Sequence, residues 1–296
     1  MKPFLIVGPT AAGKSALALT LAEKYGGVIC AMDAFQVYRG LDLGTGKATV
    51  AEQAAVPHYL INLREPLASF SVADYLRETM RTLTVIPPAA PQIWVGGTGL
   101  YMRILRQGLS AAPPSDPALV RELAAWPLTD LQREIRRLDP VWAAGADLQN
   151  PRRIIRALTV VKGTGQPLSA WQQSRSAPLL PEVRGVMLLP ARDLNRTLIA
   201  ARVARMWAAG WPDEVRALLA MDGWRESQSA RALGYLPIAD YLAGKLSKPD
   251  CLAKIITLTG QYAKRQASWF KTEPGLMTAA SVEEAARLID TRFHEN

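Results

Sequence analysis

Short apolar runs alternate with helical patterns in the first part of the chain. The runs at 4–7, 28–30 and 92–95 are only a few residues long, which is typical of buried parallel strands. Apolar positions recur at helical spacing over 14–25, and Ser71 precedes a second helical pattern as a cap residue. Alternating strands and helices predict an α/β fold with a doubly wound parallel sheet, whose ligands bind at the carboxyl ends of its strands.

The pattern changes after a proline-rich loop at 111–117. From there one helical pattern follows another, and a strand is expected only at 186–189. The chain is then expected to be helical from 193 to a capping box formed by Ser281 and Glu284. The helices expected before the strand are 119–126, 128–138 and 152–161.

Residues 8–15, Gly-Pro-Thr-Ala-Ala-Gly-Lys-Ser, match the motif G-x-x-x-x-G-K-[ST] at every specified position, between an expected strand and an expected helix. Its glycines let backbone N–H groups surround a phosphate chain at a helix N-terminus. Lys14 would contact phosphate oxygens, and the Ser15 hydroxyl would bind a phosphate-associated Mg²⁺. The predicted phosphate-binding residues are Gly8, Thr10, Ala11, Ala12, Gly13, Lys14 and Ser15.

With this motif, the strand pattern predicts a P-loop NTPase-like core made of residues 1–115 and 185–296, with a parallel sheet flanked by helices. A small all-helical lobe at 116–184 would be inserted into it. Nucleotide hydrolases of this class usually have an acid after a further strand, but the strand at 92–95 is followed by Gly-Gly-Thr-Gly-Leu-Tyr. Either Asp33, after the second strand, replaces that acid, or the chemistry is not ordinary nucleotide hydrolysis.

The charge of the chain indicates an anionic partner. Its 296 residues contain 35 Lys and Arg against 26 Asp and Glu, giving a net charge of +9 and a pI near 9.7. The excess lies after residue 95, and the stretch 251–271 has four basic residues and no acid. Mixed signs are usual on a solvated helix face, so this stretch suggests a surface for a polyanion.

Other features of the composition limit the class of protein. No apolar run is long enough to span a membrane, and the N-terminal apolar stretch is too short for a signal peptide. The two cysteines, Cys30 and Cys251, cannot form a disulfide framework or a zinc cluster. The sequence therefore predicts a protein of a reducing cytoplasm without contact to a membrane.

Several motifs in chain order resemble those of the tRNA dimethylallyltransferases, also called tRNA isopentenyltransferases. After the phosphate motif come Asp33-Ala-Phe-Gln-Val-Tyr-Arg-Gly40 and Asp42-Leu-Gly-Thr-Gly-Lys47. The resemblance continues to about residue 271. Its further motifs are Pro57-His58, Gly96-Gly-Thr-Gly-Leu-Tyr101, Arg152-Arg-Ile-Ile-Arg156, Arg231-Ala-Leu-Gly-Tyr235 and Ala263-Lys-Arg-Gln266 followed by Trp269-Phe270.

The chain also departs from that family's usual pattern. Ala34 stands where a serine is usual after the aspartate, and Gly44-Thr-Gly-Lys-Ala48 replaces Gly-Thr-Ala-Lys-Pro. Further departures are Tyr59 for His, Asn62 and Asn150 for acids, and Thr159 for Glu. We expect these departures to affect the rate of the reaction and not its nature, because Asp33, Thr98, Arg231 and the phosphate motif match the family pattern.

The resemblance implies transfer of a dimethylallyl group from its diphosphate to N6 of the adenosine 3′ of the tRNA anticodon. The loop at 8–15 with Mg²⁺ would bind the donor diphosphate. Asp33 would act as the base for N6, Thr98 as a hydrogen-bond partner at the adenine or at Asp33, and Arg231 as a contact to the diphosphate. The anticodon stem-loop would contact Ala34, Phe35, Gln36, Arg152, Arg153, Arg156, Lys264, Arg265, Trp269 and Lys271. The family implies a monomer.

Three alternatives stay open. An adenylate isopentenyltransferase would use free adenine nucleotides as acceptors, but it would need neither a helical lobe nor a long basic stretch. A P-loop small-molecule kinase would use Asp33 to deprotonate a hydroxyl, with ATP as donor. A non-catalytic tRNA-binding protein is the third, because several positions near Asp33 are substituted.

Overall fold

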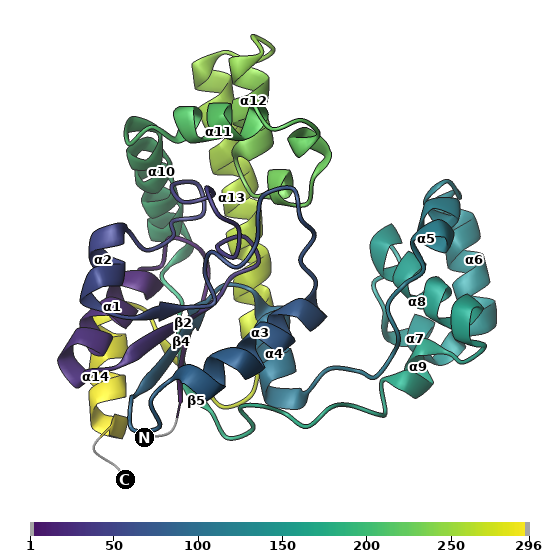
Figure 1. Cartoon of the computed structure of the whole chain (residues 1–296), viewed down its shortest axis with the longest axis horizontal. Coiled ribbons are helices and arrows are strands. Elements are labelled where there is room, and N and C mark those ends of the chain that lie inside the picture. The colour runs from purple at the N-terminus through teal and green to yellow at the C-terminus, as the bar shows by residue number, and fades with distance from the viewer. Residues whose placement is uncertain (1–2, 294–296) are drawn as a thin grey trace. The chain divides into compact units, whose positions relative to one another are not determined.

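The computed structural model of the chain describes residues 3–293, which form two compact units (Figure 1). The larger unit comprises the residues up to Arg106 and from Leu180 onwards. The smaller unit runs from Gln107 to Leu179.

The larger unit is built on one six-stranded sheet in which all neighbouring strands pair in parallel, in the order β3-β2-β4-β1-β5-β6. A parallel sheet with flanking helices confirms the predicted α/β fold. The strands are β1 (Phe4–Val7), β2 (Val28–Met32), β3 (His58–Tyr59), β4 (Gln92–Gly96), β5 (Arg184–Leu188) and β6 (Leu276–Ala279).

The helices of the larger unit include α13, which passes through it toward the end where α11 and α12 lie (Figure 1). They are α1 (Lys14–Tyr25), α2 (Val50–Ala55), α3 (Val72–Val85), α4 (Gly99–Gln107), α10 (Arg192–Ala208), α11 (Trp211–Leu219), α12 (Tyr235–Leu242), α13 (Lys248–Phe270) and α14 (Val282–Phe293). Two short 3₁₀ helices, η1 (Trp224–Glu226) and η2 (Ser229–Arg231), precede α12.

The sheet is held by apolar side chains that alternate along its strands. Ile6, Ile29, Ile93 and Val186 pack in one buried cluster with residues of α1 and α14. Such a cluster keeps the central strands in fixed register. Because these strands are parallel, the loops after β1, β2 and β4 all leave the sheet at the carboxyl ends of the strands. These loops carry the residues of the candidate site.

Two strands were not predicted. The two residues of β3 give no periodicity, and β6, Leu-Met-Thr-Ala at the sheet edge, is partly exposed and contains a threonine. The prediction that the chain is helical from 193 to 281 is therefore wrong at β6. The strands expected at 4–7, 28–30 and 92–95 are confirmed, and that at 186–189 lies at 184–188.

Helix caps follow the sequence signals in part. Ser71 forms the predicted cap of α3, since its side chain accepts a hydrogen bond from the backbone of Asp74, whose carboxylate accepts in return from Ser71. At α14, Ser281 accepts from the backbone of Glu284 at 3.1 Å. The Glu284 carboxylate, however, accepts the backbone N–H of Ala280 and not that of Ser281, so this capping box is only half formed.

The smaller unit is entirely helical and has its own buried core. Leu131, Ile135, Ile154 and Leu158 belong to one apolar cluster of this unit. Its helices are α5 (Pro117–Ala124), α6 (Leu128–Leu138), α7 (Pro140–Gly145), α8 (Pro151–Thr164) and α9 (Leu168–Trp171). The buried Asp139 carboxylate joins two of them, because it accepts from the backbone N–H of Trp142 in α7 and from the hydroxyl of Ser169 in α9.

Candidate active site

The phosphate loop connects β1 to α1 in a conformation that only glycine allows at two points. At Gly8 φ is 139°, and a Cβ would lie 2.2 Å from the carbonyl oxygen of Leu188. Gly13 has φ 90° and precedes α1, whose N-terminus has no side-chain cap. The free N–H groups at this helix end are therefore available to an anion.

The single ammonium of the loop belongs to Lys14, a half-buried residue that lines a cavity beside the loop. Nζ of Lys14 donates a 2.6 Å hydrogen bond to the backbone carbonyl of Pro9. Burial and the nearby charge of Arg202 lower the pKa of Lys14 to about 7, against the opposing effect of Asp33. An incoming polyanion would favour the protonated form of this lysine.

Asp33 and Thr98 follow the neighbouring strands β2 and β4. Oδ1 of Asp33 accepts hydrogen bonds from the backbone N–H groups of Phe35 at 2.8 Å and Gln36 at 3.2 Å. Within residues 3–293, no hydrogen bond involves Oδ2 of this carboxylate. The Thr98 hydroxyl accepts a 3.2 Å hydrogen bond from the backbone of Ala34. One carboxylate oxygen therefore fixes the turn while the other stays available to a ligand.

A cavity of about 70 Å³ joins the phosphate loop to Asp33. Besides loop residues Thr10, Lys14 and Ser15, it is lined by Asp33, Gln36, Thr45, Gly46, Val95, Gly96, Gly97, Arg202, Tyr262 and Gln266. A second cavity, of about 730 Å³, shares Lys14, Ser15, Gly46 and Arg202 with it. Phosphate-binding groups and the Asp33 carboxylate can therefore contact one ligand here.

The cavity residues that were not predicted as site residues include Arg202, Tyr262 and Gln266, which come from the helices α10 and α13. Arg202 in α10 donates to the carbonyl of Thr45, and burial lowers the pKa of its guanidinium. Burial and the Asp33 charge raise the pKa of Tyr262 to about 12, although Thr98 and Gln266 oppose this by hydrogen bonding. The sequence does contain one signal that could have identified two of them: Tyr262 and Gln266 are four residues apart, which puts both on one face of a helix.

Part of the segment 38–47 lines the larger cavity, and the segment is held from several sides. Gln36 donates to the carbonyls of Thr45 and Gly46, each at 3.3 Å. Nζ of the buried Lys47 donates to the Tyr38 carbonyl at 2.6 Å and to Asn62 Oδ1 at 2.7 Å. Asn62, one of the departures from the family pattern, thus has a structural role.

Arg231 is not among the residues that line the Asp33 cavity. It is exposed at the end of η2 and lines a separate depression together with Arg225, Lys254 and apolar residues of α12. The other predicted catalytic residues, Asp33 and Thr98, are brought together.

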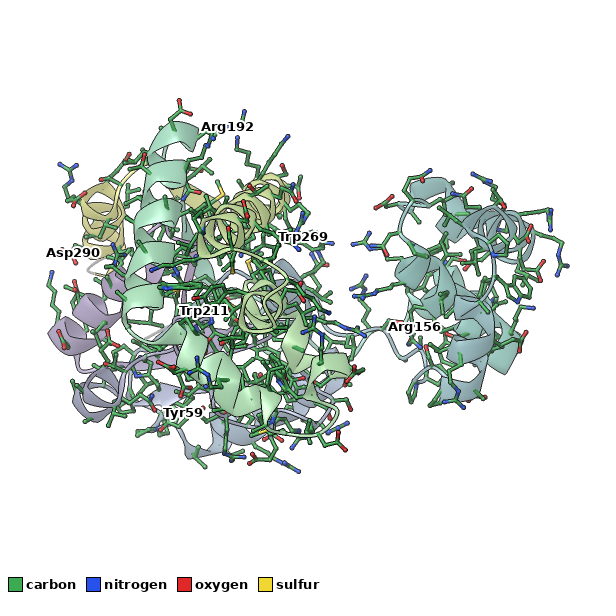
Figure 2. All side chains as sticks on the ribbon, turned by 90° about the horizontal axis from the view of Figure 1, so that it is seen from above. Tyr59, Arg156, Arg192, Trp211, Trp269 and Asp290 are labelled. Carbon is green, nitrogen blue, oxygen red and sulfur yellow. The ribbon has the colours of Figure 1, made fainter. Side chains whose placement is uncertain are left out.

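The basic residues predicted to bind tRNA differ in their surroundings. Arg152, Arg153, Lys264, Arg265 and Lys271 are exposed, and none forms a salt bridge with another residue in 3–293. The half-buried Arg156 instead donates to the Ser115 hydroxyl at 2.9 Å and to the Ala112 carbonyl at 3.4 Å, inside the smaller unit (Figure 2). Its guanidinium is thus engaged within the protein.

Trp269, labelled on the larger unit in Figure 2, is covered on one side by its own chain. The Arg103 guanidinium lies 4.1 Å from the Trp269 ring centroid and donates to the carboxylate of Glu273. A Cβ on Gly99 would come within 2.2 Å of the Trp269 ring nitrogen. The ring therefore packs α13 against the start of α4, and the contact of Trp269 with tRNA stays a prediction.

Residues 3–293 contain neither a metal-binding cluster of side chains nor a membrane-spanning helix. Within 3–293 no group of three or more His, Cys, Asp or Glu side chains could hold a metal ion. In the same range no helix has the length and apolar character needed to cross a membrane.

Comparison with known proteins agrees with this arrangement. A family model described as IPP transferase matches residues 36–273, and one described as isopentenyl transferase matches residues 1–70. The chain is 38% identical over 303 residues to the tRNA dimethylallyltransferase of Geobacillus kaustophilus, covering 97% of this chain and 96% of that protein. It is 40% identical over 275 residues to the one of Geobacter metallireducens, covering 91% and 89%.

Solved structures give the same result. The tRNA isopentenylpyrophosphate transferase of Bacillus halodurans has a TM-score of 0.71 and 31% identity, covering 99% of this chain and 97% of that one. A eukaryotic dimethylallyltransferase acting on tRNA has a TM-score of 0.82 at 23% identity, covering 100% and 80%, and supports the fold. These matches confirm the resemblance seen in the motifs, and the chain belongs to the IPP transferase family, whose relatives named above are tRNA dimethylallyltransferases and tRNA isopentenylpyrophosphate transferases.

Proposed function

We propose that the protein transfers a dimethylallyl group from dimethylallyl diphosphate to N6 of the adenosine 3′ of the anticodon, adenosine-37, in tRNA. The observation that carries the proposal is the single cavity that contains the phosphate-loop lysine, Lys14, and the carboxylate of Asp33. Group transfer requires one reaction centre that binds the donor phosphates and also accepts a proton from the acceptor. This combination therefore suits group transfer better than simple phosphate binding.

The phosphate loop would bind the donor. The free N–H groups at the N-terminus of α1, the Lys14 ammonium and the Arg202 guanidinium supply positive charge along the cavity wall. Preorganised donors of this kind are worth a few kcal/mol each when charge develops on a leaving group. Here the leaving group is the diphosphate.

A magnesium ion fits the residues at this position. Mg²⁺ keeps several waters and takes few protein ligands when it arrives with a diphosphate, so it needs no carboxylate cluster. The Ser15 hydroxyl, exposed in the first turn of α1 and lining the same cavity as Asp33, is a suitable ligand. Bound there, the ion would neutralise part of the charge on the leaving diphosphate.

Asp33 would take the proton of the acceptor amine. N6 of the adenine attacks C1 of the dimethylallyl group, the C1–O bond breaks, and its electron pair leaves with the diphosphate. The N6 proton moves to Oδ2 of Asp33, since Oδ1 already accepts the N–H groups of Phe35 and Gln36. Thr98 would hold this turn in place through its contact with Ala34.

The exposed basic residues would bind the tRNA backbone. Arg152 and Arg153 lie in the first turn of α8, which has no acid there and no side-chain cap at Asn150. Positive side chains beside a helix N-terminus are unfavourable unless an anion accompanies them, and a phosphate would provide it. Lys264, Arg265 and Lys271 offer a second unpaired basic surface in and after α13.

The acceptor adenine would leave its stack to enter the cavity. In a single-stranded anticodon loop this costs only a few kcal/mol. The proposal also includes a cytoplasmic enzyme, as the composition predicts, and a monomer, as the family resemblance implies. The contact between Arg231 and the diphosphate stays a prediction; Arg231→Lys should weaken donor binding if that contact exists, and tRNA binding if the arginine contacts tRNA instead.

An assay with purified protein, Mg²⁺, unmodified tRNA and labelled dimethylallyl diphosphate tests the function. We expect label in the tRNA at the adenosine 3′ of the anticodon. Label in AMP would show an adenylate isopentenyltransferase, and ATP turnover without transfer of label would show a kinase. Binding of tRNA without any transfer would contradict the proposed activity and indicate a binding protein.

A further inference from the structure

The side chain of Gln266 hydrogen-bonds both to the phosphate loop and to the turn after β4. It lies in α13 and only 6% of its surface is exposed. Its Oε1 accepts the backbone N–H of Thr10, in the phosphate loop, at 2.8 Å, and its Nε2 donates to the carbonyl of Gly97, beside Thr98, at 2.8 Å. One buried amide therefore binds both the phosphate loop, where the donor would lie, and the turn beside Thr98, where the acceptor would lie.

The space around this amide permits little adjustment. A Cβ on Gly97 would lie 2.0 Å from Nε2 of Gln266, so the backbone must approach the amide closely. Tyr262, one helical turn earlier, lines the same cavity, and the nearby side chains of Thr98 and Gln266 act to lower the pKa of its phenol group. The face of α13 that carries these two residues thus contacts both the phosphate loop and the turn after β4.

A second buried amide, that of Asn195, binds the phosphate loop but not the turn after β4 of the described chain. Nδ2 of Asn195, in α10, donates to the carbonyl of Thr10 at 3.2 Å, and Asn195 is 7% exposed. Both backbone polar groups of Thr10 are thus bound by side chains from two different helices. Within residues 3–293, Asn195 forms no hydrogen bond with the turn after β4, whereas Gln266 does. Substituting each residue in turn therefore separates the loss of the loop contact from the loss of the link to that turn.

We propose that Gln266 is a positioning residue that sets the distance between the donor diphosphate and the Asp33–Thr98 turn. The inference rests on the function proposed above. Group transfer needs the reacting atoms about 3–3.5 Å apart and aligned, and a misplacement of about 1 Å can cost ~10²-fold in rate. Gln266 controls this separation because the loop that holds the diphosphate and the turn beside the base both hydrogen-bond to its one amide.

The test uses single-turnover transfer with enzyme in excess over tRNA and the donor varied to saturation. When the folded enzyme also saturates the tRNA, the rate constant does not depend on the fraction of folded enzyme. Gln266→Met keeps the length of the side chain and removes both hydrogen bonds. Asn195→Ala removes only the loop contact, and Thr259→Ala, at another buried position of α13, controls for general destabilisation of that helix.

We expect Gln266→Met to lower the rate constant at saturating donor by about 10–100-fold while tRNA affinity stays within about twofold of the parent. Asn195→Ala should mainly raise the donor concentration at half-saturation, and Thr259→Ala should change neither quantity. A Gln266→Met rate constant equal to that of Thr259→Ala would overturn the proposal and leave Gln266 with a role in stability alone. Transfer by the parent in the same assay keeps this result separate from any failure of the proposed function.

Discussion

The hydroxyl of Thr98 and the backbone N–H of Ala34 are joined by a 3.2 Å hydrogen bond across the carboxyl ends of two adjacent parallel strands. The same threonine donates its backbone N–H to the carbonyl of Met32 at 3.2 Å. The turn that begins at Asp33 is therefore fixed on both sides, which orients the carboxylate before any substrate binds.

This orientation gives a direct test of Asp33 as the base. Asp33→Asn keeps an oxygen that can accept the N–H groups of Phe35 and Gln36, but an amide cannot take the proton from N6. We expect single-turnover transfer at saturating substrates to fall by about 10²-fold or more, the usual effect of losing a general base.

Two binding measurements accompany this variant. Donor and tRNA affinities should stay near those of the parent, because the phosphate loop and the basic surfaces supply the main contacts. A loss below tenfold would make Asp33 a positioning residue, whereas a large loss of Mg²⁺-dependent donor affinity would make it a ligand of the metal's water shell.

The parts of this site that could be predicted from sequence are those fixed by local signals. Glycine spacing identified the loop at 8–15, and short apolar runs located β2 and β4, so that Asp33 and Thr98 could be placed at strand ends. Gln266 reaches Thr10 across 256 positions and Gly97 across 169. Such contacts depend on how α13 packs, which residue periodicity alone does not specify.

Lys14 gives a prediction of pH dependence. Burial lowers its pKa to about 7, so the free protein carries mostly the neutral amine above pH 8. Since the diphosphate favours the protonated form, donor binding should take up a proton, and donor affinity should weaken by up to about tenfold per pH unit above pH 7. Calorimetric titration with dimethylallyl diphosphate in two buffers of different ionisation enthalpy measures this uptake.

Lys14→Arg is the matched control for this effect. Its guanidinium stays charged at all these pH values, so proton uptake on donor binding should disappear although some affinity is retained. Equal proton uptake by parent and variant would assign the titration to the diphosphate or to another group.

Two arginines of α8 should behave differently on substitution. Arg153→Glu reverses an exposed, unpaired charge, and the slope of log tRNA affinity against log salt should fall, since each phosphate contact contributes about 0.7–0.9 to it. Arg156→Met removes hydrogen bonds to Ser115 and Ala112, so it should lower the melting temperature and leave that slope nearly unchanged. Equal slopes for parent and Arg153→Glu would show that α8 does not bind tRNA phosphate.

The carboxylate of Glu214 organises a segment that lines the larger cavity. Its two oxygens accept the backbone N–H groups of Asp42 at 2.9 Å, Leu43 at 2.7 Å and Gly44 at 3.2 Å, and the Tyr235 hydroxyl at 2.7 Å. In Glu214→Gln the new NH₂ group would face donors and leave some of them unpaired, at a cost of about 1–3 kcal/mol.

We therefore expect Glu214→Gln to lower the melting temperature and weaken donor binding together, because the segment it holds lines the larger cavity, which also contains Lys14 and Ser15 of the phosphate loop. Tyr235→Phe removes only one of the four donors and should cause a smaller loss of donor affinity. Thermal unfolding and donor titration of both variants provide the comparison. If Glu214→Gln lowered stability but left donor affinity intact, the 42–44 segment would have no part in donor binding, and the donor would depend on the phosphate loop and Arg202 alone.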